Sequence, residues 1–154
     1  MGRSFPLGLA TIVLLFSTPT TAQQPVVAIT PAEIQWGEGP AILPRGVKTV
    51  RLQGSAAEPG PFAVRLKLPA GYKLGPHKHS RDEIVTVLSG SVYFGTGETF
   101  GRAKGKEYPA GSFVVLPANV PHFTWTKEEA IIQAHGIGPL DFTYINPADD
   151  PQRQ

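Results

Sequence analysis

Residues 71–90 read GYKLGPHKHSRDEIVTVLSG and hold the densest group of candidate metal ligands in the chain. His77 and His79 are two residues apart, and alternate side chains of a β-strand share one face, so both imidazoles would point the same way. Glu83 has the same parity, but on a straight strand of ~3.3 Å per residue it would lie about 13 Å beyond His79. We therefore predict a bend at residues 80–82, after which Glu83 opens the next strand facing back toward the imidazoles.

A third histidine follows a second turn. Residues 111–122 read GSFVVLPANVPH, so His122 comes directly after the turn-forming segment 117–121. Three imidazoles and one carboxylate suit a divalent transition metal and leave one or two positions of an octahedral ion open. The residues alone leave another interpretation: two histidines at the surface of a hairpin need not bind a metal, and Glu83 could pair with Arg81.

The two stretches resemble the two sequence motifs of the cupin superfamily. The first motif is matched at every spacing by Gly71, His77, His79, Glu83 and Gly90, and the second resembles the run of Gly111, Pro117 and His122. The chain departs from the family at Asn119, where cupins usually carry Gly, and at Thr126, where they often carry Asn. Asn tolerates the left-handed backbone region better than most residues, so the first change should be silent, and the second is not at a ligand position.

The resemblance covers about residues 46–137. It implies an all-β fold, a small cupin β-barrel of the double-stranded β-helix or jelly-roll type. It also implies one divalent metal ion bound by His77, His79, Glu83 and His122. Mn, Fe, Ni, Cu and Zn all suit this ligand set, and the sequence does not choose among them.

Hydrophobic patterning from Val47 onward is that of short strands. Residues 64–68 alternate apolar and charged side chains, as in a strand with one dry face. Residues 84–88 and 113–116 are apolar at nearly every position, which predicts strands packed between two layers. The 17 Gly and 16 Pro leave little room for long helices and mark turns at residues 59–61, 89–91 and 109–111.

The N-terminus has the features of a secretory signal peptide. Arg3 is the only charge before Glu33, residues 5–16 are mostly apolar, and Ala22 ends a small-residue cleavage site. The apolar run is too short to cross ~30 Å of hydrocarbon, so we expect no stable membrane anchor after signal cleavage. The expected location is therefore the periplasm or the outside of the cell.

These boundaries divide the chain into four parts. We predict a signal peptide over residues 1–22, an N-terminal extension over 23–45, the barrel over 46–146 and a polar tail over 147–154. Thr30-Pro31-Ala32-Glu33 has the form of a capping box, which predicts one short helical turn in the extension.

The formal net charge is +2, and the Lys and Arg residues are scattered singly. Because no basic stripe with interleaved aromatics is present, we expect no nucleic-acid partner. The chain has no cysteine and therefore no disulfide, which an oxidising compartment allows but does not require.

The fourth histidine, His135, lies in an apolar stretch whose two faces differ. Gln133 and His135 share one face of the predicted strand, and Ile132 and Ala134 share the other. If the polar face points into the barrel, His135 contacts the substrate or the ligand shell and is a candidate catalytic residue beside Glu83. Otherwise it is a structural residue. Three aromatic residues are candidate walls of the same pocket: Tyr72, Phe94 and Tyr144.

The resemblance to metal-dependent cupins implies an enzyme for a small oxygen-rich or aromatic molecule, with dioxygenase-, decarboxylase- or lyase-type chemistry and Glu83 as a possible base. The alternatives are a non-catalytic module that binds or senses a small molecule or metal, as in the cupins of anti-sigma factors and transcription factors, and a purely structural metal. We see no helical DNA-binding segment and no second barrel in the sequence, so we expect the enzyme. We also expect a homodimer, in which the apolar residues 26–29 add to the sheet edge of a second copy.

Overall fold

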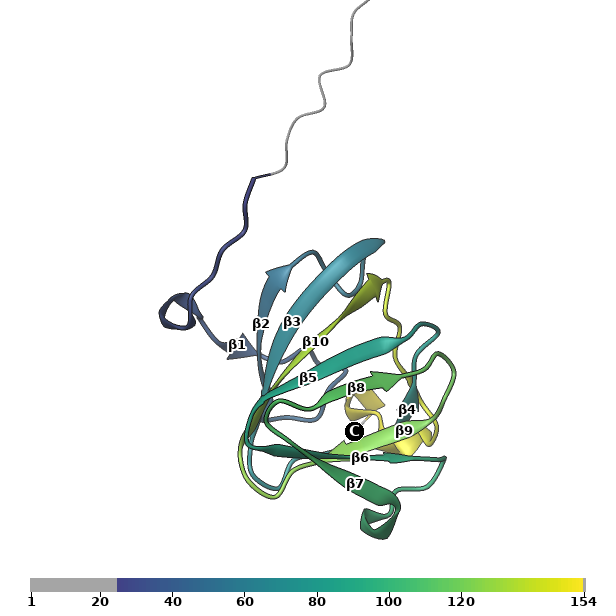
Figure 1. The fold of residues 1–154 in the computed structure, drawn as a ribbon. Coiled ribbons are helices and arrows are strands. Elements are labelled where there is room, and N and C mark those ends of the chain that lie inside the picture. The colour runs from purple at the N-terminus through teal and green to yellow at the C-terminus, as the bar shows by residue number, and fades with distance from the viewer. Residues whose placement is uncertain (1–24, 154) are drawn as a thin grey trace, which may run out of the picture.

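The computed structural model describes residues 25–153, so the signal peptide predicted over residues 1–22 lies outside the described range. Within that range two antiparallel sheets face each other and form the predicted all-β barrel (Figure 1). The six-stranded sheet has the order β1 (Gly37–Glu38), β2 (Lys48–Gln53), β3 (Gly60–Leu68), β10 (Ala130–Gly138), β5 (Glu83–Ser89) and β8 (Phe113–Leu116). The five-stranded sheet has the order β11 (Thr143–Tyr144), β4 (Lys73–Lys78), β9 (His122–Trp125), β6 (Ser91–Thr96) and β7 (Gly105–Pro109).

The main core fills the space between the two sheets. Alternate residues of the strands point into it, as the period of two in residues 64–68 predicts. The largest contributions from the six-stranded sheet are the buried Leu68, Val85, Val87 and Ile132, and β6 adds Val92 from the opposite sheet. The strands are therefore held together by one dry inner face.

The outer face of the six-stranded sheet is open at β5 and β8, which corrects the prediction that residues 84–88 and 113–116 are packed between two layers. Leu88, Phe113 and Val115 are exposed, with Phe113 at 62%. Apolar residues on both faces of these strands resemble the pattern of a buried strand, but within residues 25–153 no second layer covers the outer face of β5 and β8.

A second, smaller cluster lies on the outer side of the five-stranded sheet. Phe123 and Trp125 of β9 are buried there with Tyr93 of β6, and Phe100 covers them. Because side chains alternate along β9, these two rings point outward while His122 and Thr124 point inward. The cluster anchors the strand that carries the third histidine.

Two of the three predicted turns, at residues 89–91 and 109–111, connect these strands, whereas the one predicted at 59–61 lies earlier, at residues 56–57, because β3 already begins at Gly60. Gly90 separates β5 from β6 and Gly111 precedes β8, both with positive φ, where a Cβ would be strained. Asn119 also has a left-handed backbone, with φ of 62°, so the family's glycine is replaced there without a change of turn geometry.

Both ends of the described chain are ordered by short 3-10 turns. The first, Pro31–Glu33, is the predicted helical turn, in which the Glu33 carboxylate accepts hydrogen bonds from the Thr30 backbone N–H and hydroxyl. The segment predicted as a polar tail forms two more, Pro147–Asp149 and Pro151–Arg153, and the first packs on β4. A further 3-10 turn, Arg102–Lys104, precedes β7. No helix in residues 25–153 is long and apolar enough to span a membrane.

Candidate metal centre

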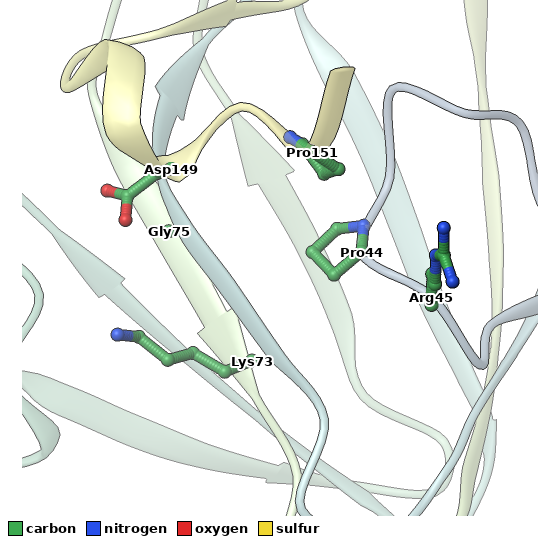
Figure 2. A pocket seen from close by; sticks show the side chains of 6 residues that line it. All are labelled: Pro44, Arg45, Lys73, Gly75, Asp149 and Pro151. Atoms are coloured by element: carbon green, nitrogen blue, oxygen red, sulfur yellow. The ribbon is translucent and has the colours of Figure 1, made fainter. Parts of the chain in front are cut away.

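A bulge in β4 aims His77 into the barrel. Leu74 and His77 both line the inner cavity although they are three residues apart, because the register between β4 and β9 shifts between them. The outer side of this bulge is covered by the C-terminal turn. Asp149 lies so close to Gly75 that a Cβ at position 75 would come within 2.7 Å of its carboxyl carbon (Figure 2). A side chain at position 75 would therefore have to displace the carboxylate of Asp149 at the point where the strand changes register.

The bend predicted at residues 80–82 is present, and Glu83 is the first residue of β5. Two hydrogen bonds join this bend to the turn before His122. The N–H of Asn119 donates to the carbonyl of His79 at 2.7 Å, and the N–H of Ala118 donates to the carboxylate of Asp82 at 2.8 Å. These bonds bring the two motifs together, and His122 pairs with His77 across β9 and β4.

The structure brings the four predicted ligands together. The three histidines offer ligand atoms that all lie within 4.8 Å of one another, and each is at most 3% exposed. The Glu83 carboxylate oxygen Oε2 lies 3.4 Å from Nε2 of His79 and 3.7 Å from Nε2 of His122. The histidine trio is thus a compact group of candidate ligands, with Glu83 as its neighbour.

Backbone carbonyls orient all three imidazoles. Nδ1 of His77 lies 2.9 Å from the carbonyl oxygen of Gly75, and Nδ1 of His122 lies 3.0 Å from that of Val120. Nδ1 of His79 contacts the carbonyl of Asp141. A carbonyl can only accept, so each Nδ1 carries a proton, and in a neutral imidazole the Nε2 atom then keeps its lone pair.

This arrangement fits a metal ion. Nε2 of His79 and Nε2 of His122 are buried and make no hydrogen bond to any of residues 25–153. Buried polar atoms of this kind are normally paired, and here the Glu83 carboxylate only approaches the two nitrogens, at 3.4 and 3.7 Å, so both still require a partner. A cation meets that requirement, because each nitrogen presents a lone pair and an oriented Nδ1–H on the other side is typical of metal-binding histidine.

The electrostatics of the metal-free site favour a neutral His77 and an ionised Glu83. Burial, assisted by the adjacent His122, lowers the pKa of His77 to about 3. Burial would raise the pKa of Glu83, but the neighbouring His122 and His79 outweigh it and hold that pKa well below its usual range. For His79, burial acts to lower the pKa, and the carboxylate of Glu83 reverses this and raises it.

Two residues that the sequence interpretation missed complete the site. Besides holding His79 through its carbonyl, Asp141 accepts the N–H of Ser80 on its carboxylate at 2.6 Å. Phe142 stacks on His77 with ring centroids 4.2 Å apart. The following strand β11 pairs with β4, placing Tyr144 opposite His77. Asp141 and Phe142 lie beyond the motifs, and nothing in their local sequence indicates contact with histidines more than sixty positions earlier.

Two of the three histidines border a cavity of about 490 Å³ in the barrel interior. His77, His79 and Glu83 are part of its lining, and most of the other lining side chains are apolar, among them Phe62, Leu66, Val85, Phe94, Ile132 and Phe142. Of the aromatic residues predicted as pocket walls, Tyr72 and Phe94 do line it. Tyr144 instead packs in the core with its hydroxyl 2.7 Å from the carbonyl of Ile42.

Comparison with known families decides the identity of this barrel. Residues 24–141 match the family model described as the ChrR cupin-like domain. The chain belongs to this cupin family. No curated protein matches it.

Solved structures share the cupin fold at low sequence identity. A protein of Methylibium petroleiphilum, described as a candidate acetylacetone dioxygenase, is 20% identical, with a TM-score of 0.64 over 85% of this chain and 88% of that one. The polyketide cyclase RemF of Streptomyces resistomycificus is 15% identical, with a TM-score of 0.58 over 68% and 75%. KdgF from Halomonas sp. is 19% identical, with a TM-score of 0.55 over 75% and 92%. At these identities the similarity shows the fold alone.

The cupin barrel does not bring His135 to the candidate metal centre. Ile132 and Ala134 of β10 line the cavity, whereas Gln133 faces the other way and its side chain accepts a hydrogen bond from Arg65 on β3. His135 has the parity of Gln133 and is not among the cavity-lining residues. The condition for its predicted catalytic role, a polar face of β10 pointing inward, is therefore not met.

Proposed function

We propose that this cupin is an exported, metal-dependent enzyme that acts on a small molecule with a largely apolar or aromatic body. The reaction would be of the dioxygenase, decarboxylase or lyase type. The observation that carries the proposal is that a compact group of three oriented histidines, two of them with an unpaired Nε2, adjoins a mostly apolar cavity that His77 and His79 line. Of the two substrate classes implied by the sequence, this lining supports the aromatic one over the oxygen-rich one, because buried polar substrate groups need partners.

His77, His79 and His122 would hold the metal ion, with Glu83 as a fourth ligand or as a proton acceptor beside it. A bound divalent metal supplies Lewis acidity or a binding place for dioxygen. The remaining cavity residues would position the substrate and exclude water. The buried apolar walls around Val85 and Phe94 suit both roles. That fold relatives are described as a candidate dioxygenase and a polyketide cyclase is consistent with small-molecule chemistry.

The second candidate function is a non-catalytic module that binds or senses a small molecule. The observation that favours it is that the matching family is described as a ChrR cupin-like domain and not by a reaction. The same fold serves many functions, so the family alone does not choose between the two.

A substrate screen separates the two functions. The protein is loaded in turn with Mn, Fe, Ni, Cu and Zn and offered phenols, diketones, hydroxy acids and sugars. We expect turnover with phenols or diketones and none with sugars. Binding without turnover for every metal and every class would support the sensing module instead.

Export rests on the pattern of residues 1–22. Mass spectrometry of the protein recovered from its native compartment should find a chain that starts at Gln23. Recovery of a full-length, membrane-bound species would contradict the proposed signal peptide.

We also propose a homodimer. Two apolar surfaces of the described chain support it: the segment 25–30, which extends away from the barrel (Figure 1), and the open outer face of β5 and β8. Val26 is 93% exposed, and β8 is an edge strand with free backbone groups that an extended segment of a second copy can pair with.

A further inference from the structure

The hydroxyl group of Tyr72 is buried without a hydrogen-bond partner. The residue is 5% exposed, and its Oη makes no hydrogen bond within residues 25–153. Tyr72 lines the same cavity as His77, His79 and Glu83. Tyr144 is a useful contrast, since it is also buried in the core but donates its hydroxyl proton to the carbonyl of Ile42 at 2.7 Å.

The backbone of Tyr72 is held firmly in place. Its N–H lies 3.1 Å from the hydroxyl of Thr126 and its carbonyl accepts the N–H of Thr126 at 3.1 Å. The Thr126 hydroxyl in turn donates to the carbonyl of Pro69 at 2.6 Å. Thr126 is one of the two departures from the cupin motif, and it is almost completely buried. Tyr72 therefore cannot reach another partner through a simple backbone shift.

A buried hydroxyl without a partner destabilises the folded protein, and such groups in native structures usually have a functional reason. A phenylalanine would fill the same space without this cost. The hydroxyl also stays protonated at neutral pH, because burial raises the pKa of Tyr72 further above its usual value. A hydrogen-bond donor in a mostly apolar cavity matches a ligand oxygen and disfavours ligands that lack one.

We propose that Tyr72 determines specificity in the cavity by donating a hydrogen bond to an oxygen atom of the ligand. The ligand class is then an aromatic or otherwise apolar molecule with two oxygen functions, one for the metal centre and one for Tyr72. This inference rests on the function proposed for the same cavity.

The first test uses the metal-free protein and two matched variants. Tyr72→Phe removes an unpaired hydroxyl, so its melting temperature should equal or exceed that of the wild type. Tyr144→Phe removes a paired one and should lower the melting temperature by roughly 3 to 5 °C. A similar loss of melting temperature for Tyr72→Phe would overturn the inference, because it would show that the hydroxyl is already satisfied inside the protein.

The second test measures binding of benzoate, 3-hydroxybenzoate and 4-hydroxybenzoate to the zinc-loaded protein by calorimetry. The carboxylate serves as the metal-binding end of these probes, and the added hydroxyl serves as the oxygen for Tyr72. We expect the wild type to bind at least one hydroxybenzoate roughly fivefold tighter than benzoate. Tyr72→Phe should bind benzoate as the wild type does and lose this preference.

The outcomes distinguish the role of Tyr72 from the proposed metal-dependent function. A wild type that takes up zinc but shows no preference, or a Tyr72→Phe variant that keeps it, overturns the role of Tyr72 and leaves the metal function standing. A wild type that takes up no zinc contradicts the proposed function, and the melting comparison then still decides whether the Tyr72 hydroxyl is unpaired.

Discussion

The ring of Phe142 stacks on the imidazole of His77, with centroids 4.2 Å apart and 8° between the ring planes. The residue before it, Asp141, holds Nδ1 of His79 through its carbonyl. Two neighbouring residues beyond the cupin motifs therefore brace two of the three histidines. Groups that orient a metal ligand typically change metal affinity by 10- to 100-fold when they are removed.

Replacing Phe142 by Ala should weaken metal binding by about tenfold or more, because His77 loses the surface that fixes its ring. Competition with a chromophoric chelator measures this directly. Phe113→Ala is the matched control, since it removes the same ring from the exposed outer face of β8 and should leave the affinity unchanged. Equal affinities for the wild type and Phe142→Ala would show that the stacking contact does not orient the ligand.

The sequence was sufficient to predict which four candidate ligands come together and the strands around them. The spacing of His77, His79 and Glu83 predicts a bend at residues 80–82, because a straight strand would carry Glu83 past the imidazoles. The bend is present and brings the Glu83 carboxylate to 3.4 Å from Nε2 of His79. The left-handed Asn119 was likewise predictable from its chemistry.

The remaining features depend on contacts between distant parts of the chain. Asp141 contacts His79 across 62 positions, and no local pattern encodes such a contact. For His135, the alternation along β10 predicted a polar face and an apolar face but not which of them points into the barrel. A polar face directed at a metal site and a polar face directed at solvent have the same sequence pattern. The prediction that residues 84–88 are buried on both faces was wrong for a related reason. Apolar side chains on both faces of a strand do not indicate whether a second layer is present.

The stability of the metal-free protein should fall as the pH falls from 6.5 to 4.5. Burial holds the folded-state pKa of His77 at about 3, whereas its unfolded-state pKa is 6.5, so the unfolded state binds the proton more readily in this range. The lowered pKa of Glu83 affects stability mainly below the usual carboxyl value of 4.5, and the raised pKa of His79 mainly above 6.5, so the dependence between pH 6.5 and 4.5 comes chiefly from His77.

Urea unfolding at several pH values measures this dependence. The free energy of unfolding should drop by at most about 1.4 kcal/mol per pH unit from this group. His77→Gln, which cannot titrate, should show a flatter dependence between pH 6.5 and 4.5. An identical slope in the variant would mean that His77 titrates normally in the folded protein.

Glu83→Gln separates a catalytic metal from a structural one. The amide has nearly the shape of the carboxylate, so the fold should be kept, while turnover of a substrate found in the screen should fall by about 10² or more if Glu83 accepts a proton. His135→Ala is the companion variant and should leave turnover and metal content unchanged, because His135 does not line the cavity. A parallel fall of stability and binding in Glu83→Gln, with no turnover to lose, would point to a structural ion.

Light scattering at tens of micromolar should give the mass of a dimer. A charge on the exposed outer face of β8, introduced by Phe113→Lys, should shift the mass toward the monomer because it places a charge in the apolar contact. Removal of residues 23–29 should do the same if this segment pairs with the partner. A wild type of monomer mass at this concentration rejects the homodimer.

The central claim is that His77, His79 and His122, with Glu83 beside them, bind one divalent metal ion. Because such an ion binds only the folded state, it should stabilise that state by on the order of 3 kcal/mol at a hundredfold excess over its dissociation constant. The most direct measurement is the metal content of the protein purified from its native compartment, by mass spectrometry of the elements. We predict about one transition-metal ion per chain in the wild type, a melting temperature that falls on chelation, and neither property in His77→Ala. A wild type without metal, whose melting curve does not respond to EDTA, would contradict the claim.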